Sequence, residues 1–214
     1  MKPMAERHSY SLQSAHGIPY LVSIYPFIRR IVEVLIAVLL LVQTLPTTLV
    51  VAVLIKLESP GPILYRQERL GQNWKKFYIY KFRSMRVDAE KDGPQWAKKN
   101  DPRVTKIGRF IRQTRIDEIP QLFNVIKGDM SLIGPRPERE CFTRKFVKKI
   151  PQFTQRLSVK PGLTGWAQVN GGYDVSPEQK FEMDMYYIRH QSPVLDLKIL
   201  LKTVKVVLTG EGAR

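Results

Sequence analysis

A long uncharged segment dominates the hydrophobic pattern of the chain. Residues 34–55, VLIAVLLLVQTLPTTLVVAVLI, contain no charged side chain over 22 positions. A helix of that length, at about 1.5 Å per residue, crosses the hydrocarbon core of a bilayer. A signal peptide fits less well, because the segment begins late and no small-residue cleavage site follows it. A soluble core helix is also less favoured, since such helices seldom stay apolar on every side. We therefore predict a membrane helix over residues 29–58, preceded by a tail over residues 1–28.

The centre of this segment is polar and contains a proline. The polar residues and the proline fall together: Gln43, Thr44, Pro46, Thr47 and Thr48. Proline lacks an N–H and clashes with the carbonyl one turn earlier, whereas threonine hydroxyls can bond the freed carbonyls. Either a kinked spanning helix or a re-entrant helix that turns back at Pro46 would fit. Basic residues flank both ends, and a spanning helix would place one of these flanks outside, against the positive-inside tendency. The pattern favours a re-entrant helix broken at Pro46.

The best strand candidate lies after the membrane segment. Residues 77–85, FYIYKFRSM, are rich in aromatic and apolar side chains, which is typical of a strand. With a period of two, Lys81 and Arg83 share one face of that strand. Two cations spaced in this way could hold a phosphate group, and a solvated edge strand is the alternative. The polar residues 88–102 follow, and Gly93 and Pro94 indicate a loop.

Three further segments have helical spacing. Basic residues recur every third position from 103 to 112 beside apolar ones, which predicts a short amphipathic helix. Residues 119–127 predict a second helix, closed by Gly128. Residues 195–208 place three lysines on one face of an otherwise apolar helix, as in helices that lie in a membrane interface; packing against the core is the alternative. The fold class predicted is α+β and dominated by helices, with a small β element in a compact catalytic domain over residues 59–214.

The charge balance indicates anionic partners. Of the 214 residues, 35 are Lys or Arg and 19 are Asp or Glu, giving a formal net charge of +16. Such a chain suits nucleic acid, an acidic membrane surface or phosphorylated substrates. The single cysteine, Cys141, excludes an internal disulfide. No metal-binding cluster of histidines and cysteines, P-loop or dinucleotide motif is present, so any metal would be a hard cation held by carboxylates and phosphates.

An acidic pair, Asp117-Glu118, stands out within this basic chain. A structural interpretation is available, because Asp before a helix caps N–H groups and Glu suits the first turn. The arginines around the pair, among them Arg112 and Arg136, instead indicate an anionic ligand. Carboxylates would repel that ligand unless a divalent metal or covalent chemistry intervened. One carboxylate that binds Mg²⁺ and a second that acts as nucleophile would remove this conflict.

Several stretches, in this order, resemble the bacterial sugar transferase family, in particular its small monotopic phosphoglycosyl transferases. They are IKLESPGPILYRQERLG, KFRSM, TRIDEIPQLFNVIKGDMSLIGPRP, KPGLTGWAQVNG and the tail YYI…SPVLDLKILLKT. The resemblance covers nearly all of residues 29–212. KFRSM or the acidic pair alone would not be specific, whereas the whole series is. The chain resembles the minimal catalytic unit of larger relatives, which carry additional N-terminal membrane helices and a soluble domain.

The resemblance implies an activity and a set of site residues. Family members transfer a sugar-1-phosphate from a UDP-sugar to polyprenyl (undecaprenyl) phosphate, release UMP and so begin glycoconjugate assembly at the cytoplasmic face of the bacterial inner membrane. Carried over by motif, Asp117 is the nucleophile that forms an aspartyl-phosphosugar, and Glu118 binds Mg²⁺ or Mn²⁺. The anion-binding positions are Lys81, Arg83, Arg112 and Arg136. Membrane lipids, downstream glycosyltransferases and a second copy of the chain are the other partners implied.

Two positions depart from the family pattern. The helix break, usually Ser-Pro, is Leu45-Pro46 here, and Asn170-Gly171-Gly172 replaces the more common Asn-Gly-Arg, so the sugar is not carried over. A basic nucleic-acid binder on a membrane tether is one alternative, disfavoured because no RNA- or DNA-binding motif is present. A scaffold without catalysis is another. A third keeps the reaction but lets the lipid phosphate attack directly, in one step.

Overall fold

The computed structural model describes residues 19–91, 93–96, 98, 100–171 and 175–210. Its helices are α1 (Pro19–Glu58), α2 (Lys106–Gln113), α3 (Leu122–Lys127), α4 (Glu140–Val147), α5 (Trp166–Asn170), α6 (Pro177–Arg189) and α7 (Pro193–Thr209). Its strands are β1 (Leu64–Leu70), β2 (Lys76–Phe82), β3 (Ser131–Ile133) and β4 (Gly162–Thr164). The described residues also form three 3₁₀ helices: η1 (Gln72–Trp74), η2 (Ile116–Gln121) and η3 (Pro151–Ser158). The predicted helix-dominated α+β class is confirmed.

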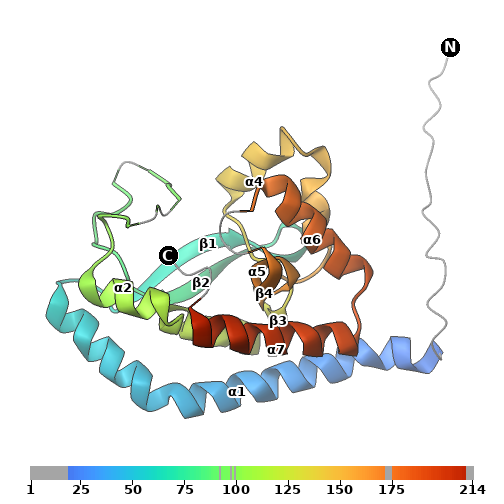
Figure 1. Ribbon diagram of the computed structural model, residues 1–214, viewed down its shortest axis with the longest axis horizontal. Coiled ribbons are helices and arrows are strands. Elements are labelled where there is room, and N and C mark those ends of the chain that lie inside the picture. Colours follow the sequence, from blue (N-terminus) through green and yellow to red (C-terminus); the bar gives the residue numbers. More distant parts are fainter. Residues whose placement is uncertain (1–18, 92, 97, 99, 172–174, 211–214) are drawn as a thin grey trace.

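Helix α1 is continuous over 40 residues and includes Pro46. Figure 1 shows it as one bent helix along an edge of the molecule. Near the proline, the Thr44 hydroxyl donates to the Leu40 carbonyl (2.6 Å) and Thr48 donates to Leu45 (2.8 Å). Threonine bonds of this kind accompany helix bends. The predicted break at Pro46 is not confirmed, because one helical span continues through it.

Helix α1 starts earlier than the helix predicted from residue 29. Helix α1 begins at Pro19, so residues 19–28 belong to the helix rather than to the predicted tail, while residues 1–18 lie outside the described residues. Within the described part of the chain, residues 24–58 form the one helix long and apolar enough to cross a membrane. Only 11% of its most apolar window is buried, which suits contact with lipid better than a core position.

The N-terminal half of α1 is attached to the rest of the fold by two arginines that the sequence presented only as flanking charge. Arg29 donates to the Ile133 carbonyl (2.6 Å), and Arg30 donates to the carbonyls of Val125 (2.7 Å) and Ile126 (2.9 Å). The Arg30 contacts satisfy carbonyls at the C-terminal end of α3, where a cation also suits the helix dipole. The helix is therefore part of the fold and not a detachable anchor.

Two small sheets organise the remainder. Strands β1 and β2 pair antiparallel, with Tyr65 opposite Lys81, and β3 pairs with β4 in parallel. The predicted strand at 77–85 is confirmed over most of its length, since β2 ends at Phe82. The backbones meet closely at Gly162, where a Cβ would lie 2.0 Å from the Gly134 nitrogen. A larger residue at Gly162 would therefore push the two segments apart.

The hydrophobic core consists of two clusters, and α1 contributes to both. The larger joins Ala37 of α1 to buried residues of β2, α3, β3 and α7, among them Ile79, Val125 and Ile199. The smaller contains Val51, Ile55, Phe82 and Ile111. Together the clusters fix β2 and the segment between α2 and α3 against α1. That segment carries the acidic pair.

The predicted short helices are present with shifted bounds. Helix α2 begins at Lys106, three residues after the predicted start, because the Thr105 hydroxyl caps it by accepting from the Gly108 N–H. Helix α3 ends at Lys127, and Gly128 caps it in the left-handed conformation (φ 90°), in agreement with the predicted helix end. In α7 the ammonium groups of Lys198 and Lys202 lie 5.5 and 5.0 Å from the centre of the Trp166 ring. The same helix exposes Leu197, Leu201, Val204 and Leu208.

Candidate active site

The chain reverses direction immediately before the acidic pair. Arg115, between α2 and η2, has a left-handed backbone (φ 60°), which costs a non-glycine residue about 1–2 kcal/mol. Strain of this kind tends to lie at functional sites. Asp117 and Glu118 follow in the first turn of η2, and Asp117 is only 7% exposed. Because the residue at the N-cap is Arg115, the geometry does not support a capping role for Asp117.

Glu118 is held by two cations from other elements. The Lys81 Nζ atom of β2 donates to Glu118 Oε1 at 2.7 Å, and the Arg136 guanidinium contacts both carboxylate oxygens. Burial alone would raise the pKa of Glu118. The charges of Arg136 and Lys81 outweigh burial and hold that pKa well below its usual value. Glu118 is therefore ionised at neutral pH, and one cation-lined carboxylate is fixed beside Asp117.

Asp117 is in a different electrostatic position. Its Oδ2 atom lies 4.0 Å from Lys81 Nζ, at the outer limit of an ion pair. Burial raises the pKa of Asp117 to about 6, and the charge of Lys81 only partly opposes this effect. At neutral pH the carboxylate is still mostly ionised, yet burial leaves it poorly solvated. A poorly solvated carboxylate next to several cations is well suited to act as a nucleophile or a base.

The structure brings together most of the predicted anion-binding residues. Lys81, Arg112 and Arg136 all line the cavity that contains the acidic pair, and the charges of all three act on Asp117. Arg83 is placed differently. Its guanidinium donates to the carbonyls of Ser59 (2.8 Å) and Pro60, just after the end of α1. This geometry favours a structural role for Arg83 over the predicted contact with phosphate.

The cavity suits a polyanion of substrate size. Its volume is about 470 Å³, within the range typical of small-molecule sites. Among the described residues, nine cationic side chains line it against four carboxylates. The cations are Arg69, Lys81, Arg83, Arg86, Arg112, Arg115, Arg136, Arg139 and Lys180. The excess of positive charge focuses a field that attracts anions.

Arg136 stands between two prolines, and its segment is held through its carbonyl groups. The Gly162 N–H donates to the Pro135 carbonyl (2.9 Å), Arg156 donates to the carbonyl of Arg136 (2.9 Å), and Arg69 donates to that of Pro137 (3.2 Å). Because prolines have no N–H, such bonds from elsewhere are needed to fix the segment. They fix the backbone from which the Arg136 side chain reaches Glu118.

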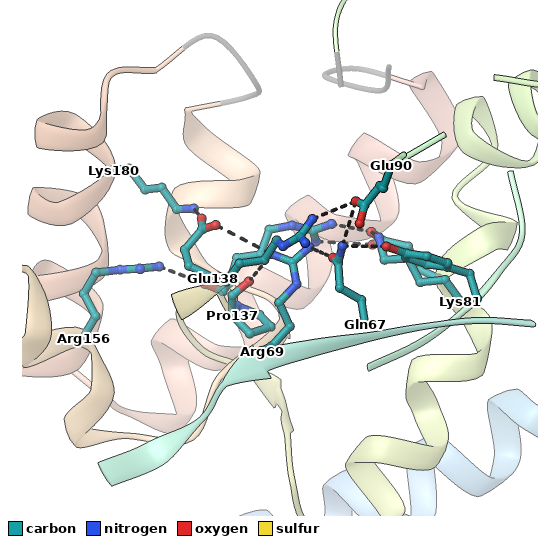
Figure 2. A network of polar contacts seen from close by, with 12 residues as sticks. Gln67, Arg69, Lys81, Glu90, Pro137, Glu138, Arg156 and Lys180 are labelled. Carbon is teal, nitrogen blue, oxygen red and sulfur yellow. Dashed lines mark hydrogen bonds and ion pairs between the residues drawn. The ribbon is translucent and has the colours of Figure 1, made fainter. Parts of the chain in front are cut away.

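Further ion pairs support this segment. Arg156 also donates to Asp184 of α6 (2.6 Å), and both side chains are almost fully buried. Lys180 contacts Glu138, while Glu90 accepts from Arg139 (2.7 Å); Figure 2 shows where Lys180, Glu138 and Glu90 lie. The sequence analysis missed all of these residues. No local pattern marks them, since the partners in these three pairs are 28, 42 and 49 positions apart.

The family described as bacterial sugar transferase matches residues 24–210. The chain belongs to this family. The match includes most of α1, both sheets, the acidic pair and α7, which confirms the resemblance inferred from the sequence motifs.

Three similar proteins are named as transferases that act on undecaprenyl phosphate. One from Aeromonas hydrophila, named UDP-N-acetylgalactosamine-undecaprenyl-phosphate N-acetylgalactosaminephosphotransferase, is 50% identical over 89% of the chain and 46% of its own length. A putative undecaprenyl-phosphate N-acetylgalactosaminyl 1-phosphate transferase of Bacillus subtilis (strain 168) is 53% identical over 73% of the chain and 88% of its own length. The UDP-glucose:undecaprenyl-phosphate glucose-1-phosphate transferase of Escherichia coli (strain K12) is 38% identical over 90% of the chain. The chain spans about half the length of the Aeromonas and Escherichia relatives, 46% and 44% respectively.

The carboxylates of the candidate site are compatible with a hard divalent cation such as Mg²⁺. Among the described residues, no three His, Cys, Asp or Glu side chains are grouped as a metal-binding cluster. Two adjacent carboxylates, Asp117 and Glu118, remain. Mg²⁺ is commonly bound by one or two carboxylates together with substrate phosphates and water, so this pair fits Mg²⁺ better than a metal that needs a complete protein cage.

Proposed function

We propose that this chain transfers a sugar-1-phosphate from a UDP-sugar to polyprenyl phosphate, releasing UMP and forming a polyprenyl diphosphate-sugar. The observation that carries the proposal is the buried Asp117, beside a cation-held Glu118, in a cavity with an excess of positive charge. Membership of the bacterial sugar transferase family and the names of the relatives support it. In the cell this reaction would begin assembly of a glycoconjugate.

The proposed chemistry has two displacements. The Asp117 carboxylate oxygen attacks the phosphorus that bears the sugar, the bond from that phosphorus to the bridging oxygen breaks, and UMP leaves with that oxygen. An oxygen of polyprenyl phosphate then attacks the same phosphorus, and the Asp117 carboxylate is released. Lys81, Arg112 and Arg136 would hold phosphate oxygens through both steps. Arg136 is suited to this role because its planar guanidinium binds two oxygens at once.

Glu118 would bind Mg²⁺, or Mn²⁺, together with phosphate oxygens of the substrate. Such a cation would neutralise part of the charge on the diphosphate and polarise its phosphorus–oxygen bonds. In the structure the oxygens of Glu118 already accept from Lys81 and Arg136. A metal would therefore share or displace these contacts, which leaves the two cations available to the substrate.

Arg136 gives a test of phosphate binding that conserves charge. We expect Arg136→Lys to lower kcat/KM by about tenfold or more, because lysine keeps the charge but loses the bidentate geometry. Initial rates over a range of UDP-sugar concentrations measure this. The matched control is Arg144→Lys, which changes an arginine of α4 whose side chain is 68% exposed. Equal kcat/KM for wild type and Arg136→Lys would show that bidentate binding by Arg136 is not used.

We also propose that the chain acts at the cytoplasmic face of the bacterial inner membrane, with α1 re-entrant and α7 in the interface. The chain has one cysteine, so Cys141→Ser gives a background for single-cysteine labelling. We expect Ser14→Cys and Leu57→Cys, on either side of the apolar segment, to react with an impermeant maleimide in inverted vesicles but not in intact cells. Pro46→Leu should favour a straight span. Labelling of Ser14→Cys from outside, with Pro46 intact, would contradict re-entry.

Product analysis tests the function itself. The purified chain is incubated with Mg²⁺, polyprenyl phosphate and, in turn, several UDP-sugars, and the products are identified by mass spectrometry. We expect UMP and one polyprenyl diphosphate-sugar from at least one donor. UDP in place of UMP would contradict the proposal, because the bond between the sugar and its oxygen would have been broken instead of the diphosphate bond. A free sugar phosphate with no lipid product would also contradict it, because water and not the lipid would then be the acceptor.

A further inference from the structure

The Gln168 side chain is unusual among the amides of the structure. It lies in α5 and lines the same cavity as the acidic pair. Both its Oε1 and its Nε2 are buried without a hydrogen-bond partner. Buried amides are nearly always bonded, and an unsatisfied one lowers stability. A second unpartnered amide nitrogen, on Gln121, does not line this cavity.

Gln168 lies next to the Arg136 segment. A Cβ on Gly165 would be 2.8 Å from Gln168 Oε1 and 2.1 Å from the Gly134 carbonyl oxygen. The backbone at the start of α5 thus packs on the residue that precedes the Pro-Arg-Pro segment. The amide is therefore near the part of the cavity where the phosphate attacked by Asp117 would be held.

The chemistry of an amide does not match the phosphates. Phosphate oxygens are acceptors, and Lys81, Arg112 and Arg136 already supply charged donors. A neutral amide offers one acceptor and one donor group, which matches a ligand group that both donates and accepts, such as a hydroxyl or an acetamido group. The phosphorus attacked by Asp117 bears the sugar, whereas the nucleoside is one phosphate further away. The hydrocarbon of a lipid acceptor offers nothing to an amide.

We propose that Gln168 binds the sugar of the donor substrate, through a hydroxyl or acetamido group, and so contributes to the choice among UDP-sugars. This assignment rests on the proposed function. A site built to hydrogen-bond a substrate group discriminates against donors that lack it, because its own polar atoms are then left unpaired. The unpartnered Oε1 and Nε2 of Gln168 offer such a substrate group one acceptor and one donor.

The test compares donors that differ only in the sugar. Wild type, Gln168→Met and Gln168→Asn are assayed for kcat/KM with UDP-glucose, UDP-galactose and UDP-N-acetylgalactosamine, and for the affinity of UMP. Methionine keeps the size but removes the hydrogen bonds, and asparagine keeps the amide but shortens its reach. The control is Asn170→Ala, on the same helix but exposed and bonded to Trp166 and Lys202.

We expect Gln168→Met to lower kcat/KM for the preferred donor by about tenfold and to leave the affinity for UMP unchanged. The kcat/KM values for the three donors should therefore differ less from one another than they do in wild type. Gln168→Asn should fall between Gln168→Met and wild type. An equal loss for all three donors, accompanied by weaker UMP binding, would overturn the assignment in favour of the nucleoside. If the ratios of kcat/KM among the three donors were the same in both variants as in an active wild type, the assignment of Gln168 would be overturned while the proposed function would stand. A wild-type chain that releases no UMP from any donor would overturn the proposed function and the assignment with it.

Discussion

Asp117→Asn is expected to lower turnover by more than about 10³-fold, the scale seen when a catalytic nucleophile is removed. Asparagine has nearly the same shape as aspartate, so it still fits beside Lys81 and Glu118, but its amide cannot attack phosphorus. Steady-state formation of the polyprenyl diphosphate-sugar measures the effect.

Stability provides the control for this variant. Because burial raises the pKa of Asp117 to about 6, the folded state holds its proton more tightly than the unfolded state does. The Asp117 carboxyl therefore contributes to the free energy of unfolding at low pH, where it is protonated. That contribution is lost as pH rises from about 4 through about 6. Asparagine avoids that loss, so metal-free Asp117→Asn should melt at pH 7 no lower than wild type. Substantial turnover in a folded Asp117→Asn protein would favour direct attack by the lipid phosphate.

Glu118→Gln is the second large effect, and it concerns the metal. We expect a loss of turnover greater than the roughly 100-fold that removal of an outer-shell group can cost. We also expect a shift of the Mg²⁺ midpoint to higher concentration, because a neutral amide is a much weaker ligand for a hard cation. Lys81 and Arg136 would lose their shared partner at the same time. A Mg²⁺ titration of the initial rate separates weaker metal binding from a lower maximal rate.

The matched control is Glu138→Gln. Glu138 also lines the cavity, contacts Lys180 and Arg69, and is not assigned to the metal. Its variant can lose activity, since two cations lose a partner, but its Mg²⁺ midpoint should match that of wild type. If the midpoint were unchanged in Glu118→Gln as well, Glu118 would be a structural anchor for Lys81 and Arg136 and not a metal ligand.

The site residues close to the acidic pair were predictable because their signals are local. The period of two in β2 predicted the face of the strand on which Lys81 lies. The glycine at position 128 predicted the end of α3, where it takes the left-handed conformation. The motif resemblance identified Arg112 and Arg136, which the fold does bring to Asp117. Gly172, one of the two departures from the family pattern, lies outside the described residues, so its effect stays a prediction.

The contacts of Arg83 could not be predicted from the local sequence pattern. A period of two placed it beside Lys81, but β2 ends at Phe82, and the Arg83 guanidinium reaches the carbonyls that follow α1. That partner lies more than twenty residues earlier in the chain and is set by packing. The Arg156–Asp184 pair is similar, because nothing near either residue indicates the other. The extension of α1 to Pro19 likewise contains a long-range contact, since the Tyr25 hydroxyl donates to Asp196 of α7 (2.6 Å).

The covalent role of Asp117 is tested most directly by incubating the enzyme with a UDP-sugar labelled in the sugar and Mg²⁺, without lipid acceptor. We predict a burst of UMP of no more than one equivalent per active site, because the first displacement needs no acceptor. The label should appear on the protein, be removed by hydroxylamine as expected for an acyl phosphate, and map to the peptide containing Asp117. Adding polyprenyl phosphate should transfer it to lipid. An enzyme that turns over with acceptor yet shows neither burst nor label without it would contradict the covalent role of Asp117.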